Sequence, residues 1–313
     1  MTRNVLIGNG INIQFGGKDK YSNHAILGRM FENMRAGKYE QILPACSAKD
    51  QIQLFEGLKQ VLINIDNYQP SEEYLFLDIE KERAKRLYSE TTKLEDIGME
   101  DFFLALEIAG FKANDKEDFR KEAQHEMQMP ILDAIYNDGA IDHIDYGNGV
   151  RKFLSGYDNI FTINYDSNLD QFLPKVYHLH GQFSQLAPEF DANSDFSREH
   201  PEQCRSNEVV PGFEHVYSNA IMSWYWLEKY GDWMGKESTY GADKFQALNG
   251  KLDIIGMAPS NDDHLFIMIS QSGISSVDYY YHDDSDRSEM QRKFKAKPIT
   301  YKSVDKLWNR LNR

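Results

Sequence analysis

The first strong signal in the chain is a short apolar run, residues 4–7, which ends at Gly8 and indicates a buried strand that leads into a turn. From about residue 23 to residue 147, apolar side chains recur at three- and four-residue spacing, which is typical of amphipathic helices. Strand-like runs return only after this helical block. The first strand must therefore find its partners far along the chain.

The later part of the sequence alternates between strand-like and helix-like stretches, a pattern typical of a mostly parallel sheet covered on both faces. Helices are expected at residues 216–230 and 304–311. We predict an α/β fold with a Rossmann-like core formed by residues 1–22 and 151–313, interrupted by a helical insertion at residues 23–150. The runs predicted to be strands, besides the first, are residues 159–163, 175–179, 252–256, 265–269 and 277–281.

Charge and cysteine content exclude several classes of protein. The chain has 35 Lys and Arg against 49 Asp and Glu, a net charge of −14, and such a surface repels a nucleic-acid backbone. It has no apolar stretch long enough for a membrane span and no signal-peptide core at its start. Cys46 and Cys204 cannot form a cysteine-based zinc site. We expect a cytoplasmic protein that binds neither membrane nor metal.

Two glycines separated by one residue follow the first predicted strand, in the order Gly8, Asn9, Gly10, with Asn12 close behind. A strand that runs into such a loop can bring backbone amides close to a pyrophosphate, although an ordinary strand-to-helix turn has the same pattern. The third glycine of the dehydrogenase fingerprint is absent, because Ile13 stands at its position. The loop therefore predicts a dinucleotide site but disfavours hydride transfer.

Asn164 and Asp166 directly follow the run at residues 159–163. Ligand crevices of open α/β sheets lie at such strand ends. Asn164 could orient a ribose hydroxyl or a water molecule, and Asp166 could offset positive charge on an oxocarbenium-like centre. Both residues could instead cap the following turn.

Two histidines lie at the end of the next predicted strand, where His178 and His180 share one face of the chain. A histidine in a cleft can transfer a proton near neutral pH, but the pair could also hold a metal or be structural. A later apolar run ends at Gly256 and leads into a polar turn with Ser260. These residues would lie at the same edge of the sheet.

This succession of motifs resembles the sirtuin-like fold, in particular the NAD-hydrolysing effectors of bacterial anti-phage defence. The matching motifs lie within residues 4–17 and 159–282, and the helical block has no counterpart. The resemblance implies that Asn164 lies by the nicotinamide ribose with Asp166 beside it, and that His180 is the general base. It implies NAD+-binding roles for the loop and turn residues Gly8, Asn9, Gly10, Asn12, Gly256 and Ser260.

The differences from this family limit which NAD-dependent reaction is expected. Sirtuin deacylases hold a structural zinc with four cysteines, and this chain has two in total, which disfavours deacylation. The expected reaction is cleavage of NAD+ to nicotinamide and ADP-ribose, with water as the acceptor. A non-catalytic module that binds NAD or ADP-ribose is the alternative, and an NAD-dependent deacylase is the third hypothesis. The resemblance further implies an abortive-infection effector controlled by homo-oligomerisation or by a partner such as a HerA-type ATPase.

Overall fold

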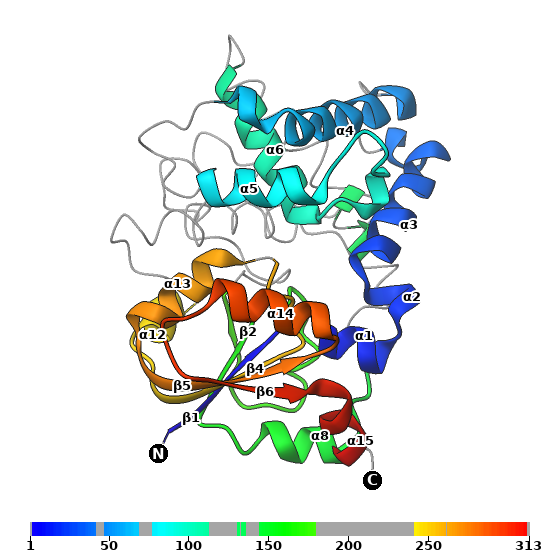
Figure 1. Ribbon diagram of the computed structural model, residues 1–313. Coiled ribbons are helices and arrows are strands. Elements are labelled where there is room, and N and C mark those ends of the chain that lie inside the picture. The colour runs from blue at the N-terminus through cyan, green and yellow to red at the C-terminus, as the bar shows by residue number, and fades with distance from the viewer. Residues whose placement is uncertain are drawn as a thin grey trace, which may run out of the picture.

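The computed structural model describes residues 2–41, 47–68, 77–112, 130–131, 133–135, 144–179, 241–260 and 262–311. Its centre is a sheet of six strands in the order β3-β2-β1-β4-β5-β6, in which every neighbouring pair is parallel (Figure 1). This is the strand order of the doubly wound Rossmann fold, which confirms the α/β prediction. The strands are β1 (Arg3–Ile7), β2 (Asn159–Thr162), β3 (Tyr177–His178), β4 (Asn249–Ile255), β5 (Gly273–Tyr281) and β6 (Ile299–Ser303).

The strand order reverses around β1, which pairs with β2 on one side and with β4 on the other. Ile7, the last residue of β1, is level with Thr162 of β2 and with Ile255 of β4. The three strands therefore end together. In open α/β sheets the crevice beyond such a reversal is where ligands bind.

Both faces of β1 are buried, as expected for a central parallel strand. Val5 and Ile7 pack into one hydrophobic cluster and Leu6 packs into a second. Figure 1 shows α8 and α15 below the sheet in this view, while α12, α13 and α14 lie above it. These helices are α8 (Gly147–Leu154), α12 (Ala242–Gln246), α13 (Asp263–Gln271), α14 (Asp284–Lys293) and α15 (Val304–Leu311).

The described residues between β1 and β2 form helices and contain no strand. The first two short helices lead away from the sheet, and the longer ones lie over its carboxyl edge (Figure 1). Apart from α8, the helices of this segment are α1 (Gly10–Gly16), α2 (Lys18–Tyr21), α3 (Asn23–Arg35), α4 (Ala48–Ile63), α5 (Leu77–Leu87) and α6 (Met99–Lys112), with 3-10 turns η1 (Lys38–Gln41), η2 (Ile65–Asn67) and η3 (Leu94–Asp96). The described part of the chain has no helix with the length and apolar character needed to cross a membrane.

Local signals explain where the longer helices begin and how they pack. Ser22 caps α3 by accepting the amide of Ala25, and Ser47 forms a capping box at the start of α4. Phe31, Phe55 and Phe102, from α3, α4 and α6, pack edge to face with ring centres 5.0–6.3 Å apart. The amphipathic periodicity of this block was therefore a correct helix signal.

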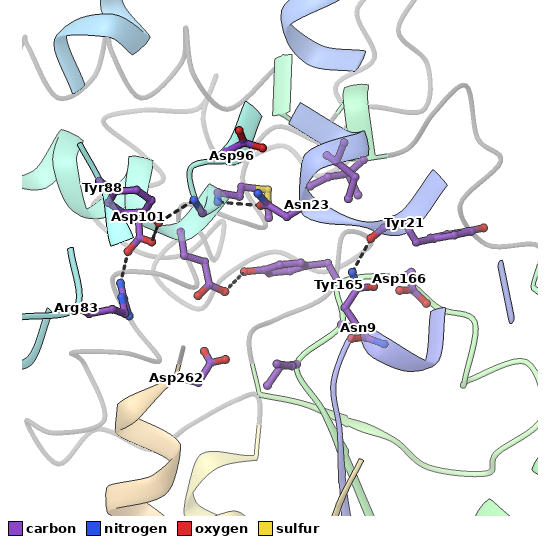
Figure 2. Close-up of a pocket in the computed structure, with 17 residues that line it drawn as sticks. Asn9, Tyr21, Asn23, Arg83, Tyr88, Asp96, Asp101, Tyr165, Asp166 and Asp262 are labelled. Atoms are coloured by element: carbon purple, nitrogen blue, oxygen red, sulfur yellow. Dashed lines mark hydrogen bonds and ion pairs between the residues drawn. The ribbon is translucent and has the colours of Figure 1, made fainter. Parts of the chain in front are cut away.

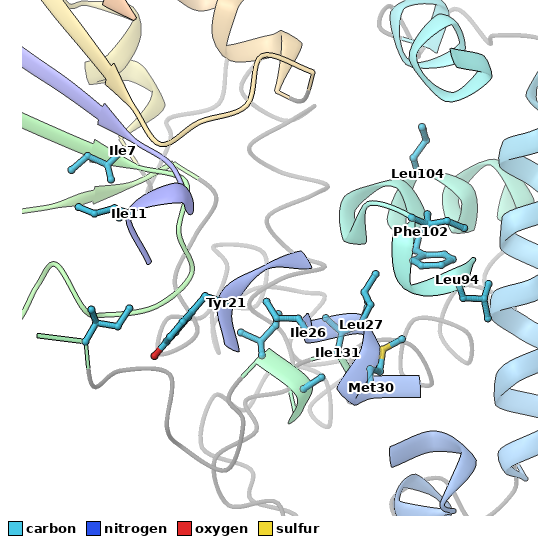
Figure 3. Close-up of a cluster of buried hydrophobic side chains, with 14 of the residues drawn as sticks. Ile7, Ile11, Tyr21, Ile26, Leu27, Met30, Leu94, Phe102, Leu104 and Ile131 are labelled. Carbon is cyan, nitrogen blue, oxygen red and sulfur yellow. The ribbon is translucent and has the colours of Figure 1, made fainter. Parts of the chain in front are cut away.

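One hydrophobic cluster joins the sheet to these helices. Figure 3 follows it from Ile7 and Ile11 beside the sheet, through Tyr21 and Ile26, to Phe102 in α6. Because a single cluster crosses the boundary, the helices are held against the carboxyl edge of the sheet by apolar burial as well as by polar contacts.

The structure corrects one predicted strand and adds another. Residues 265–269 belong to the helix α13, so the strand prediction there was wrong. Their buried members include Leu265, Phe266, Met268 and Ile269, a helical spacing that a five-residue apolar window cannot distinguish from a strand. β6 was missed because it is half exposed and contains Thr300 and other polar residues instead of an apolar run. Helix α15 occupies the predicted range 304–311, whereas residues 216–230 lie outside the described residues.

Candidate functional site

A cavity of about 350 Å³ lies at the carboxyl ends of the central strands, between the sheet and the helices over it (Figure 2). Its volume is in the range of small-molecule sites. The sheet side is lined by Asn9 after β1, by residues 163–166 after β2 and by Asp262 after β4. The other wall consists of Tyr21, Asn23, Ile26, Arg83, Tyr88, Asp96, Gly98, Met99, Glu100, Asp101 and Ile135.

The backbone of Asn164 is fixed by its neighbours in the sheet. Its amide donates to Thr162 Oγ1 at 3.1 Å, and that hydroxyl donates to the carbonyl of Ile7 at 2.9 Å. Its carbonyl accepts from His178 Nδ1 at 2.8 Å. The end of β2 is thus tied to both neighbouring strands, and Asn164 is held firmly in the cavity wall.

The side chain of Asn164 has no such support. The residue is 4% exposed, and neither its Oδ1 nor its Nδ2 has a hydrogen-bond partner among the described residues. Leaving a buried polar group unpaired costs about 1–3 kcal/mol. The carboxamide of this lining residue therefore has donor hydrogens and an acceptor oxygen that no described group satisfies.

Asp166 is engaged in a buried polar network. Asn12 Nδ2 donates to its Oδ2 at 2.6 Å, and the amide and side chain of Asn168 donate to its Oδ1 at 3.0 and 2.7 Å. Tyr146 donates in turn to Asn12 Oδ1 at 2.7 Å. The network fixes the carboxyl group of Asp166 at the cavity wall, while Asn12 itself is not in the lining.

The three predicted glycines pack against one another. Gly8 N donates to the carbonyl of Ile255 at 2.9 Å, and Gly10 N donates to that of Gly256 at 2.7 Å. A Cβ on Gly8 would lie 2.5 Å from the Gly256 oxygen, and one on Gly10 would lie 2.7 Å from Gly256 Cα. The glycines are needed because two turns meet backbone to backbone. The amides of Gly8 and Gly10 point to protein carbonyls, and of the loop only Asn9 lines the cavity.

The remaining predicted residues have different outcomes. His178 is buried, with Nδ1 on Asn164 O and Nε2 2.9 Å from Asp170 Oδ2, so it anchors the strand ends. His180, the expected base, lies outside the described residues. Ser260 is described but is not part of the cavity lining. No group of described residues has the composition and geometry of a metal site.

Sequence reasoning missed the charged wall contributed by the helices. Arg83 of α5 and Asp101 of α6 form a buried ion pair, and the hydroxyl of Tyr88 also donates to Asp101 (Figure 2). Glu100 accepts a hydrogen bond from Tyr165 across the cavity at 3.4 Å. In the sequence these carboxylates look like an ordinary acidic first turn of a helix.

The described part of the lining has more acidic than basic groups. Among its described residues are five carboxylates and one guanidinium, that of Arg83. Burial raises the pKa of Tyr165 well above its usual value, and the charges of Glu100 and Asp262 raise it further. Tyr165 is therefore a neutral hydrogen-bond donor. Such a cavity favours a ligand whose positive charge lies close to the lining carboxylates.

The structure brings Asn9, Asn164 and Asp166 together around one cavity, places the glycines behind it, and adds a helical wall with Glu100 and Arg83. This arrangement can bind a polar, partly cationic small molecule and can stabilise positive charge that develops in a reaction. Comparison of the chain with models of protein families, with curated proteins and with solved structures found no match.

Proposed function

We propose that this protein hydrolyses the bond between nicotinamide and ribose in NAD+, releasing nicotinamide and ADP-ribose. The observation that carries the proposal is Asn164, a residue of the cavity lining at the strand-order reversal of a Rossmann-like sheet, whose buried carboxamide has no hydrogen-bond partner among the described residues. Such a group suits a ribose hydroxyl or an attacking water.

The charge of the cavity supports cleavage of a glycosidic bond. As the bond from ribose C1′ to the nicotinamide nitrogen breaks, the electron pair moves to the ring, and positive charge develops on the ribose as in other glycoside hydrolyses. Fixed carboxylates stabilise this charge without reorganising. Asp166 is such a group, because Asn12 and Asn168 hold both of its oxygens.

In the proposed reaction water adds to C1′, nicotinamide leaves as a neutral molecule, and one proton of the water passes to a base. The motif resemblance assigns that base to His180 and orientation of the water or ribose to Asn164. The same carboxylates repel a pyrophosphate, so the phosphates of NAD+ would lie outside this acidic part of the cavity.

The proposal extends to a role as an abortive-infection effector in anti-phage defence. Constant cleavage of NAD+ would harm the host cell, so we propose control by homo-oligomerisation or by a partner such as a HerA-type ATPase. Both parts stay predictions from the resemblance of the sequence motifs.

The test is to incubate the purified protein with NAD+, with and without candidate partners, and to measure nicotinamide and ADP-ribose by chromatography. We expect both products, and we expect Asn164→Ala to abolish them. Asn64→Ala is the matched control, because Asn64 is an exposed asparagine at the end of α4 and lies outside the cavity.

Other outcomes would identify the alternatives. Binding of NAD+ or ADP-ribose without product in any assembly would favour a non-catalytic module. Consumption of NAD+ only with an acyl-lysine peptide would indicate a deacylase. Full activity of Asn164→Ala would contradict the proposed site.

A further inference from the structure

Glu100 connects the two walls of the cavity. It belongs to the first turn of α6, in the helices over the sheet, and it accepts a hydrogen bond from the hydroxyl of Tyr165 at 3.4 Å. Tyr165 is adjacent to Asn164 on the sheet side, and both residues line the cavity with Glu100. A carboxylate of the helical wall and Asn164 of the sheet side therefore line the same cavity.

The positive charge of Arg83 is offset within the wall. Its guanidinium pairs with Asp101, and the side chains of the two residues are only 5% and 4% exposed. The other charged groups of the described lining are Asp96, Glu100, Asp166 and Asp262, all of them carboxylates. The described part of the lining therefore has more acidic than basic groups, which favours a cation.

The buried carboxamide of Asn164 is an independent sign of a ligand. Its donor and acceptor are complementary to another carboxamide or to a hydroxyl. The acidic lining favours a cationic ligand. The unpaired carboxamide of Asn164 favours a ligand that also has a polar group able to hydrogen-bond with it. Oxidised nicotinamide has both features on one ring, a positive charge and a carboxamide, whereas reduced nicotinamide has lost the charge.

We infer that the cavity selects the oxidised, cationic nicotinamide ring by charge, and that Glu100 of the helical wall is a specificity-determining residue for it. The inference rests on the proposed function, since it deepens the choice of substrate at the same site. It assigns the helices between β1 and β2 a direct part in recognition, beyond covering the sheet.

The experiment compares two probes of nearly equal shape and different charge, 1-methylnicotinamide, which is a cation, and nicotinamide, which is neutral. Their binding to the full chain is measured by calorimetry, together with that of NAD+ and NADH. We expect the wild type to prefer each cationic member of a pair by about tenfold, the effect of one partly screened charge at contact distance.

Three variants locate the source of the preference. Glu100→Gln should remove most of it, and Glu100→Asp should retain part of it because the charge is kept. Glu95→Gln is the matched control, since it removes an equal charge from η3 without touching the cavity lining. Circular dichroism and thermal unfolding would verify that each variant is folded.

The results separate this inference from the proposed function. Equal binding of both probes to the wild type, or an unchanged preference in folded Glu100→Gln, would overturn the inference even if NAD+ is cleaved. A charge preference that depends on Glu100 would support it even if no nicotinamide is released, a result that would count against the hydrolase.

Discussion

The amide of Gly10 donates a 2.7 Å hydrogen bond to the carbonyl of Gly256, so the turn after β1 rests directly on the turn after β4. This close backbone contact explains why glycine is needed in the loop without invoking a bound phosphate. It also joins segments that flank the cavity on two strands.

The first prediction concerns this contact. In Gly10→Ala the new Cβ would lie 2.7 Å from Gly256 Cα, closer than real Cβ contacts, and two backbone segments would have to separate. We expect a loss of about 1–3 kcal/mol in the free energy of unfolding, typical of overpacking, measured by urea denaturation. Gly57→Ala is the control, since Gly57 lies within α4 with open space around its Cα. That change should be neutral or stabilise by up to about 1 kcal/mol. Equal stability of the two variants would contradict the packing role.

The second prediction concerns the polar network behind the cavity. Asn12→Ala removes a donor from Asp166 and an acceptor from Tyr146, both buried. We expect the free energy of unfolding to fall by about 1–3 kcal/mol because buried polar groups lose their partners. Thermal unfolding of the variant checks this. Asn67→Ala, at an exposed turn, should change stability by less than about 0.5 kcal/mol. A stability loss no greater than in that control would show that Asn12 is not structural.

The third prediction separates stability from function at Asn164. Asn164→Leu replaces an unpaired buried carboxamide with an apolar group of similar size. We expect the free energy of unfolding to rise by about 1 kcal/mol, because the unpaired polar group is removed, while nicotinamide release is lost. Denaturant titration and the product assay measure the two effects. A large loss of stability would instead indicate that Asn164 has a structural partner.

The fourth prediction concerns pH. Burial alone raises the pKa of Asp278, but the hydrogen bonds and charges of Lys251 and Lys302 outweigh burial and lower it below its ordinary value of 3.8. A carboxyl with a lowered pKa in the folded state stabilises the protein above its unfolded-state pKa. That contribution is lost as the pH falls below about 3.8 through the folded-state pKa.

Its neighbour on β4 should behave in the opposite way. Burial raises the pKa of Asp253, and the charge of Asp278, its partner in the strand register, adds to the rise despite the hydrogen bond from Tyr157. Ionised Asp253 therefore costs stability at neutral pH, and the cost disappears as the pH falls through its raised pKa. We expect Asp278→Asn to lower the neutral-pH stability by about 2 kcal/mol and Asp253→Asn to lower it much less. Unfolding curves across the acidic range measure both variants, and similar losses would contradict the assigned shifts.

The sequence allowed much of the sheet to be predicted, because apolar runs followed by glycine or polar turns mark buried parallel strands. It failed at residues 265–269, where the run is too short to show its helical period, and at β6, whose side chains are mixed in polarity. Asn9, Asn164 and Asp166 could be assigned to one site because parallel strands end at a common edge.

The helical half of the cavity could not be predicted in the same way. Glu100 and Asp101 follow each other in a helix start, and nothing in that local pattern shows that one accepts a hydrogen bond from Tyr165 and the other pairs with a buried arginine. Which residues face each other across the cavity depends on how two distant segments pack. No local periodicity encodes that contact.

The placement of β1 between β2 and β4 has a consequence for the growing chain. Ile7 pairs with Thr162 and with Ile255, so the ribosome completes the helical wall long before the sheet wall can close. A chain that ends between α6 and β2 has Glu100 but lacks Asn164, and one that ends before β4 lacks a neighbour of its central strand. The cavity can therefore be completed only late in synthesis, and an unfinished chain would lack the NAD+-cleaving activity proposed above.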